Sequence, residues 1–298
     1  MRVGFVGLGV MGAPMARNVR KRFDCVTVYD IDAGRMAAFA DGSFNTSGDV
    51  AGVAKQSDVV ILSLPGSAVV ERVLLGPDGI APNAAGGSVV IDTSTTEPTV
   101  SRRVAEKLAS HGIGFLDAPV SGGEKAAIDG SLSFMVGGDR QVFDRCLPVF
   151  ESMGTSIVRI GESGMGEVAK LVNNLIVGAT FAVVAEGFAL AVKNGLDPAV
   201  LYEAIRGGWA QSKVLDLSAE AYLNRNFQPG GTVDIHWKDL GYALSLAKDS
   251  DVPTPITAIA HEVFKASRSS GDGSLAQPAV VMLWERLLGI RIEGKDND

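Results

Sequence analysis

The sequence predicts two domains: a doubly wound α/β domain with a mostly parallel sheet at residues 1–162, and an all-helical domain at residues 163–298. Up to about residue 161, short runs rich in β-branched and aromatic residues alternate with amphipathic stretches, which is typical of an α/β sheet. After Gly164 the β-rich runs end, and helical spacing continues to about Leu288. A chain of 298 residues is long enough for two hydrophobic cores.

Seven runs form the predicted strands of the first domain, and their regular spacing favours parallel strands joined by helices. In chain order they are RVGFV (2–6), CVTVY (25–29), DVVILSL (58–64), SVVIDT (88–93), GIGFLDA (112–118), LSFMVG (132–137) and SIVRI (156–160).

The second domain is predicted to begin with a long interdomain helix at about 164–194, which follows a cluster of glycines. Gly195 closes this helix, and Asp197 with Pro198 starts the next one. Further helices are predicted at 198–206, 213–224, 238–248, 254–269 and 278–288, with a polar tail at 293–298.

Charge and composition narrow the class of partners and the compartment. A net charge of −7 and a pI near 5.1 argue against nucleic acid or an anionic membrane as the main partner. The two cysteines and three histidines lack the spacing of a metal or redox motif, so no metal is expected. Because the N-terminus begins directly in a strand-like run, we expect a cytoplasmic protein. Polar residues interrupt the apolar segment 171–192, so we expect a helix buried between domains and not a membrane span.

A glycine-rich run, GLGVMG, follows the first predicted strand and opens a helix. This is the context that the dinucleotide-binding fingerprint GxGxxG requires, with the phosphates at the helix N-terminus. Gly7 allows the tight turn, Gly9 lets the backbone approach a pyrophosphate, and Gly12 allows close packing of helix on strand. The predicted cofactor-binding residues of this loop are Gly7, Leu8, Gly9, Val10, Met11 and Gly12.

Asp30 lies at the end of the second predicted strand, near the spacing of about 20 residues at which a ribose-binding acid follows the glycines. A carboxylate there accepts hydrogen bonds from a ribose 2′-OH and repels a 2′-phosphate. We therefore predict NAD as the cofactor, with NADP as an alternative because Arg35 is close in sequence.

The run DAPVSGG follows the strand GIGFLDA, so it lies at the strand end where open α/β sheets bind ligands. Ser121, Gly122 and Gly123 offer a hydroxyl and backbone N–H groups to a substrate carboxylate. The alternative interpretation of this run is a plain glycine-rich turn.

Two further loops follow predicted strands and are expected to line the nicotinamide side of the same crevice. Leu64 and Pro65 follow one strand, and Thr93–Thr95 follow the next. Leu64, Pro65 and Thr95 are therefore predicted cofactor-binding residues.

Lys170 and Asn174 stand four residues apart, which places both side chains on one face of the long, mostly apolar helix. An ammonium group beside apolar surface costs several kcal/mol unless function uses it. This pair predicts an enzyme with Lys170 as its proton-transfer group. The run KDL at Lys238–Leu240 is predicted to begin another helix and offers a second lysine, although a solvated helix start is an equal alternative.

Four motifs in order, GLGVMG, DAPVSGGEKAAIDG, GESGMGEVAKLVNN and HWKDLGYAL, make the chain similar to the β-hydroxyacid dehydrogenase family. The resemblance spans residues 3 to about 288. It implies an N-terminal Rossmann domain, a long interdomain helix and a helical C-terminal domain that often mediates oligomerisation. We therefore expect a homo-oligomer, a dimer or a tetramer.

The resemblance implies a role for each matching residue. Lys170 is the catalytic acid or base, Asn174 holds the substrate, and Lys238 lies near both substrate and nicotinamide. Ser121, Gly122 and Gly123 form the cradle for the substrate carboxylate.

Within the family, the stretches GGEKAAIDGSLSFMVGGD, AIRGGWAQSKVLD and NRNFQPGGTVDIHWKDL resemble tartronate semialdehyde (2-hydroxy-3-oxopropionate) reductases. The alternatives are a 3-hydroxyisobutyrate dehydrogenase and a broad short-chain aldehyde reductase. Trp209 departs from the reductase pattern, which has a smaller aliphatic residue there, and it would shrink the pocket if it faced it.

Overall fold

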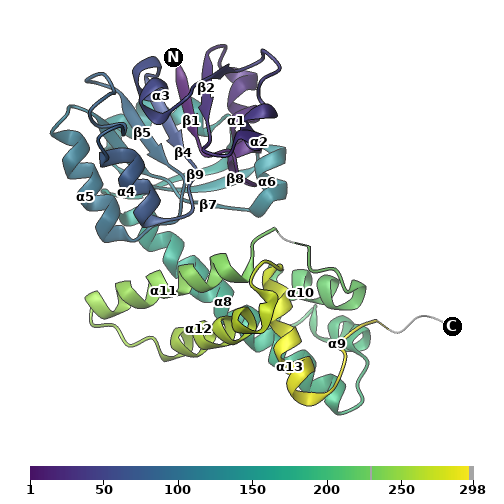
Figure 1. Ribbon diagram of the computed structural model, residues 1–298. Coiled ribbons are helices and arrows are strands. Elements are labelled where there is room, and N and C mark those ends of the chain that lie inside the picture. The colour runs from purple at the N-terminus through teal and green to yellow at the C-terminus, as the bar shows by residue number, and fades with distance from the viewer. Residues whose placement is uncertain (229, 295–298) are drawn as a thin grey trace. The chain divides into compact units, whose positions relative to one another are not determined.

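The computed structural model describes residues 1–228 and 230–294 (Figure 1). The chain divides into two compact units, Met1–Lys170 and Leu171–Asp298. A mostly parallel sheet with helices forms the first unit and helices form the second, which confirms the predicted fold class. The predicted domain boundary after residue 162 stays a prediction. Residues 295–298 of the predicted polar tail lie outside the described residues.

The sheet of the first unit has the order β3-β2-β1-β4-β5-β6-β8-β7, with β9 paired to β8. Neighbouring strands from β3 to β6 are parallel. Chain order runs one way from β1 to β3 and the other way from β4 to β6, so it reverses between β1 and β4. Doubly wound sheets bind their ligands at such a reversal. The nine strands are β1 (Val3–Val6), β2 (Val26–Tyr29), β3 (Asn45–Thr46), β4 (Val59–Leu62), β5 (Val89–Asp92), β6 (Gly114–Asp117), β7 (Val120–Ser121), β8 (Leu132–Gly138) and β9 (Gly154–Gly161).

All seven predicted strands are present, but β3 and β7 were not predicted from the sequence. Each has two residues, which is too short for a periodic pattern to register. β8 also runs antiparallel to β6 and β7, so this end of the sheet departs from the parallel order.

Side chains alternate along the central strands, so each face of the sheet has its own core. Val3 and Phe5 belong to the core that also holds Met15 of α1 (Gly12–Arg22), whereas Val6 belongs to the opposite core. The first core includes α6 (Gly123–Asp129) and α7 (Arg140–Phe150), and the second includes α3 (Val50–Gln56), α4 (Ser67–Leu75) and α5 (Pro98–Ala109), as Figure 1 shows for α4 and α5. The short α2 (Ala33–Ala37) follows β2.

The second unit is built from helices around one core, which includes Phe188, Tyr222 and Phe264. Its helices are α8 (Met165–Lys193), which continues from the first unit, α9 (Pro198–Ile205), α10 (Lys213–Asn224), α11 (Val233–Asp249), α12 (Pro255–Ser267) and α13 (Val281–Leu288). A π-helical turn at Arg268–Asp272 and a 3₁₀ turn at Gln277–Val280 separate α12 from α13.

The predicted start of the helix at Lys238 is wrong, because α11 begins at Val233. Thr232 caps it, and its hydroxyl accepts the N–H of Ile235 at 3.2 Å. Lys238 therefore lies inside α11, more than a turn beyond the helix start.

The sequence predicted a buried helix at this position, but α8 is not buried along its whole length. Val172, Ile176, Val183 and Leu190 are exposed apolar residues on it. Among the described residues, it is the one helix whose length and mean hydropathy, 2.1 in its most apolar window, reach those of a membrane span. A core helix of a globular protein meets the same criteria, so this is weak support for a membrane location.

Candidate active site

The GLGVMG loop joins β1 to α1 as predicted, and its three glycines have different surroundings. Gly7 has φ of +96°, and a Cβ there would lie 2.2 Å from the carbonyl oxygen of Ser63. A Cβ on Gly12 would lie 1.9 Å from the carbonyl oxygen of Gly7, so this residue permits the close helix packing.

Gly9 is different, because the protein itself does not require a glycine there. The nearest heavy atom to a Cβ at Gly9 would be Nη1 of Arg35, at an ordinary contact distance of 3.7 Å. The open side of this backbone is where the fingerprint places the pyrophosphate, so the loop fits a dinucleotide.

Asp30 follows β2 and is buried against the glycine-rich loop. Its Oδ2 accepts the backbone N–H of Leu8 at 2.6 Å, and its Oδ1 accepts that of Asp32 at 2.8 Å. Arg35 forms an ion pair with Oδ2 at 3.4 Å, and its side chain is half exposed. The carboxylate therefore connects the end of β2 to the loop, beside the guanidinium of Arg35.

The loops after β4 and β5 are joined by hydrogen bonds at the carboxyl edge of the sheet. The Leu64 N–H donates to Oγ of Ser94 at 2.9 Å, and the Thr93 hydroxyl donates to the Leu62 carbonyl at 2.6 Å. Thr95, which directly follows Ser94, is half buried, and Pro65, which directly follows Leu64, is exposed. The structure thus brings these predicted residues to one edge, as the topology requires.

Ser121, Gly122 and Gly123 form the turn from β7 into α6. Ser121 is half buried, and both glycines are exposed with positive φ, +130° for Gly122 and +69° for Gly123. A Cβ on Gly122 would lie 2.6 Å from the Cβ of Ala126, whereas no atom lies within 4 Å of a Cβ on Gly123. Backbone N–H groups are accessible here without a covering side chain.

Lys170 lies beside this turn. Its Nζ donates a hydrogen bond to the carbonyl of Val120 at 2.7 Å, and Val120 is the residue before Ser121. Lys170 is half buried on α8. The structure therefore brings the predicted proton donor and the predicted carboxylate cradle together within the first unit.

Asp117 anchors the start of α8 at the end of β6. Its Oδ1 accepts the N–H of Gly164 at 2.7 Å and its Oδ2 accepts that of Glu167 at 3.2 Å. Burial raises the pKa of Asp117 to about 6, while the hydrogen bonds from Gly164 and Glu167 oppose this shift. At neutral pH the carboxyl is therefore mostly ionised, which suits the positive end of the helix dipole.

In the second unit, Asn174 belongs to a buried polar cluster between α8 and α11. Its Nδ2 donates to Oδ2 of Asp239 at 2.7 Å, and its backbone carbonyl lies 3.0 Å from Nε2 of His236. Lys238 forms an ion pair with Oδ1 of Asp239 at 3.1 Å and lies over the ring of Tyr242. Asp239 thus links Asn174 to Lys238 inside this unit.

Four further polar residues lie near the predicted site residues but were not predicted from the sequence: Asp117, Glu167, Asp239 and His236. Asp117 and Asp239 stand inside the DAPVSGG and KDL runs, so those motifs contained them. The available signal for Asp117 was an acid at the end of a buried strand. Glu167 and His236 stand inside the GESGMGEVAKLVNN and HWKDLGYAL motifs, but no local pattern indicated their contacts, because their partners are distant in sequence.

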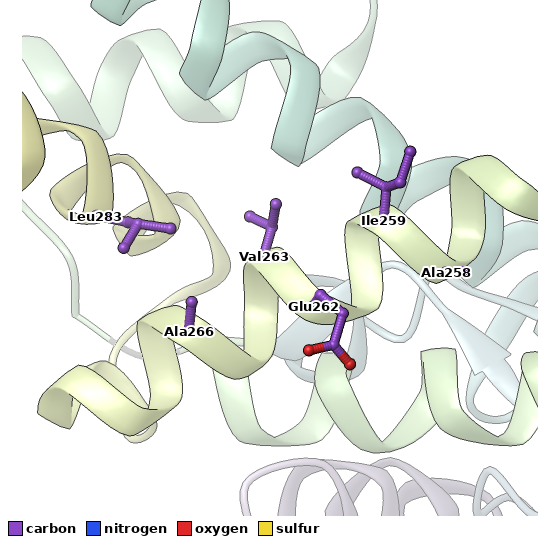
Figure 2. A pocket seen from close by; sticks show the side chains of 6 residues that line it. All are labelled: Ala258, Ile259, Glu262, Val263, Ala266 and Leu283. Atoms are coloured by element: carbon purple, nitrogen blue, oxygen red, sulfur yellow. The ribbon is translucent and has the colours of Figure 1, made fainter.

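A groove in the second unit involves none of the predicted site residues. It has a volume of about 490 Å³ and lies between α12 and α13, lined by Ala258, Ile259, Glu262, Val263, Ala266 and Leu283. Figure 2 shows aliphatic side chains of both helices on its walls. Its lining is apolar apart from Glu262. Trp209 is fully exposed in the loop between α9 and α10.

Two family models match successive parts of the chain. The NAD-binding domain of 6-phosphogluconate dehydrogenase matches residues 2–161. The NAD-binding region of NADP-dependent 3-hydroxyisobutyrate dehydrogenase matches residues 164–284.

Individual proteins resemble the chain over nearly its whole length. It is 36% identical to 2-(hydroxymethyl)glutarate dehydrogenase of Eubacterium barkeri, over 99% of this chain and 98% of the relative. It is also 36% identical to 2-hydroxy-3-oxopropionate reductase of Escherichia coli K12, over 96% of this chain and 97% of the relative. A solved structure of Mycobacterium tuberculosis 3-hydroxyisobutyrate dehydrogenase with L-serine has a TM-score of 0.86 and 31% identity, and covers 95% of this chain and 99% of that one.

The fold, the glycine-rich loop and these matches define a nicotinamide-dinucleotide-dependent dehydrogenase or reductase that acts on CH–OH groups. The chain belongs to the β-hydroxyacid dehydrogenase family. The resemblance inferred from the four motifs is therefore confirmed, and so is the prediction of an NAD(P) cofactor.

Proposed function

We propose that this hydroxyacid dehydrogenase is a tartronate semialdehyde reductase, which interconverts 2-hydroxy-3-oxopropionate and its alcohol and prefers NAD to NADP. The observation that carries the proposal is the hydrogen bond from Lys170 Nζ to the carbonyl of Val120, next to Ser121–Gly123. A substrate carboxylate held at Ser121–Gly123 would have its reacting oxygen near Lys170 only if few atoms separate the two groups. This favours a short 3-oxoacid.

The roles of the residues follow from this arrangement. When bound, the dinucleotide supplies the hydride that adds to the aldehyde carbon. Lys170 gives its proton to the oxygen that becomes the hydroxyl, and it takes the proton back in the reverse reaction. Ser121 and the N–H groups of Gly122 and Gly123 hold the carboxylate.

Asn174 and Lys238 are assigned to the substrate from the second unit. Asn174 offers an amide to the substrate, and Lys238 offers positive charge to the substrate and the dinucleotide in a protein that is acidic overall. The Asp239 carboxylate supports both assignments, because it accepts from Asn174 and pairs with Lys238.

The preference for NAD rests on Asp30, whose negative charge opposes a 2′-phosphate. Leu64, Pro65 and Thr95 are assigned to the nicotinamide side, at the ends of β4 and β5. Arg35 is the residue that would favour NADP if Asp30 did not neutralise it.

A substrate panel tests the proposal. We expect the highest kcat/KM for tartronate semialdehyde, followed by methylmalonate semialdehyde, with succinate semialdehyde and an uncharged aldehyde of matched length lower. Best activity on the uncharged aldehyde would refute the carboxylate cradle and indicate a broad aldehyde reductase. A preference for methylmalonate semialdehyde would instead indicate a 3-hydroxyisobutyrate dehydrogenase.

Oxidation of 2-(hydroxymethyl)glutarate and of L-serine belongs in the same panel, because relatives are named for the former or studied with the latter. Efficient oxidation of 2-(hydroxymethyl)glutarate would agree with the argument from chain length, because its hydroxymethyl group and one carboxylate are on the same carbon, but it would contradict a pocket limited to small substrates. In that case the cradle would remain and the pocket would be larger than proposed.

The predicted homo-oligomer is also part of the proposal. The exposed apolar residues Val172, Ile176, Val183 and Leu190 on α8 support it, because such a row is seldom left in water. Light scattering on the full chain tests it, and a monomer at micromolar concentration would contradict it.

A further inference from the structure

Glu167 is a fully buried acid in the first turn of α8, and the proposed reaction gives it no role. It stands three residues before Lys170, so the two residues are neighbours on the helix surface, about one turn apart along the axis. Thr96, Asp92 and Asp117, which surround it, also belong to the first unit.

The Glu167 carboxyl connects α8 to the loop after β5. The Thr96 hydroxyl donates to its Oε1 at 3.1 Å, and Thr96 itself is fully buried beside the Ser101 hydroxyl at 3.0 Å. Thr96 directly follows Thr95, which is assigned to the nicotinamide side. The same loop is joined to Leu64 through Ser94.

We propose that Glu167 is a positioning residue whose neutral carboxyl ties the loop at Thr93–Thr96 to the first turn of α8, and so fixes Lys170 relative to the nicotinamide side of the site. The inference rests on the proposed function for its catalytic consequence. The state of the carboxyl itself can be tested without a substrate.

The surroundings of Glu167 do not support a negative charge. It has no exposed surface, its Oε2 has no hydrogen-bond partner within the described ranges, and no cation is paired with it there. The acids Asp92 at the end of β5 and Asp117 at the end of β6 face it from the neighbouring strands. An isolated charge in such a place is strongly disfavoured.

The pKa of Glu167 agrees with this geometry. Burial first, and then the negative charge of Asp92, raise the pKa of Glu167 well above its ordinary value, while hydrogen bonds from Thr96 oppose the shift. An acid whose pKa is raised in the folded protein stabilises it at low pH relative to high pH. That contribution is lost as the pH rises from the unfolded pKa through the folded one.

Infrared difference spectroscopy on the full chain without substrate tests the protonation state. Near pH 8 Asp117 is ionised, since its pKa is about 6, so a carboxylic-acid carbonyl band belongs to another group. We expect this band in the wild type, its loss in Glu167→Gln, and its persistence in Glu162→Gln, an exposed control paired with Arg159. A wild type without the band would overturn the proposal.

Thermal unfolding across pH gives a second, independent readout. Glu167→Gln keeps the shape of the acid but cannot ionise, so its Tm should exceed that of the wild type by an amount that grows as the pH rises above about 4.5. Glu162→Gln should show no such growth. A constant or shrinking difference for Glu167→Gln would contradict a neutral Glu167.

Kinetics then separate positioning from simple stability. Glu167→Gln should keep kcat within about 3-fold of the wild type, because an amide still accepts from Thr96. Glu167→Leu fills the space without the hydrogen bond and should lower kcat by about 10- to 100-fold, with NAD affinity nearly unchanged. Equal kcat in both variants would remove the positioning role. Should Glu167→Leu fail to fold, the spectra and Tm of Glu167→Gln still decide the protonation state, and Thr96→Val repeats the kinetic test from the other side of the bond.

Discussion

The two units supply functional groups in different ways. In the first, most of the proposed groups come from loops at strand ends, where Gly7, Gly122 and Gly123 adopt backbone conformations that favour glycine. Lys170, near the start of α8, is the exception. In the second, Asn174 and Lys238 lie within long helices, linked by the buried Asp239. Loop sites therefore leave contiguous motifs in the sequence, whereas helical sites are assembled from side chains that are far apart along it.

Lys170 should show the largest effect, because it is the one side chain assigned to proton transfer. Lys170→Ala is expected to lower kcat by about 10²- to 10⁴-fold and to leave dinucleotide binding nearly intact. Lys170→Arg keeps the positive charge, but its guanidinium does not release a proton near neutral pH. Relative to Lys170→Ala, it should therefore restore substrate binding more than turnover.

The control for this prediction is Lys193→Ala, at the far exposed end of α8, where Nζ contacts the Leu288 carbonyl. It should behave as the wild type in steady-state kinetics. A wild-type kcat in Lys170→Ala would show that Lys170 is not the proton-transfer group. The first unit would then lack the catalytic role that we assign to it.

Asp239 tests whether the helical cluster matters as much as the loops. Asp239→Ala leaves the Asn174 amide and the Lys238 ammonium without their shared partner, so kcat/KM should fall by about 10- to 100-fold. Asp234→Ala is the matched control on α11, since that acid is exposed and pairs with Arg268. If both variants were equally active, the second unit would be a scaffold alone.

Asp30 tests the charge argument for the dinucleotide. Asp30→Ser should raise the ratio of kcat/KM for NADPH to that for NADH by about 10-fold, because the repulsion of the 2′-phosphate is removed and Arg35 loses its partner. In Asp30→Ser/Arg35→Ala this gain should disappear. A wild type that already favours NADPH would show that Arg35 dominates at this loop.

The start of α11 gives the smallest expected effect. Thr232→Ala should lower the free energy of unfolding by about 1 kcal/mol, because it removes the hydroxyl that caps the helix. Ser212→Ala is the matched comparison, since Ser212 caps α10 by accepting the Leu215 N–H at 3.0 Å. Denaturant unfolding measures both. If only Ser212→Ala were destabilising, the helix would start nearer to Lys238, as the sequence suggested.

The sequence by itself determined the features that depend on local pattern. Short runs rich in β-branched and aromatic residues predicted the seven longer strands, and glycines with their neighbours predicted the loop from Gly7 to Gly12. The four-residue spacing of Lys170 and Asn174 predicted that both lie on one face of the long helix. Each of these follows from the fixed period of a strand or helix, or from the backbone freedom of glycine.

Only the tertiary structure decided which distant groups meet. It paired the two-residue strands β3 and β7, and it placed Asp117 at the start of α8, Glu167 against Thr96, and Asp239 between Asn174 and Lys238. A helix or strand period fixes which face a side chain lies on, but it does not fix what that face contacts. The contacts follow from how strands pair and helices pack, and these depend on residues far apart in the chain.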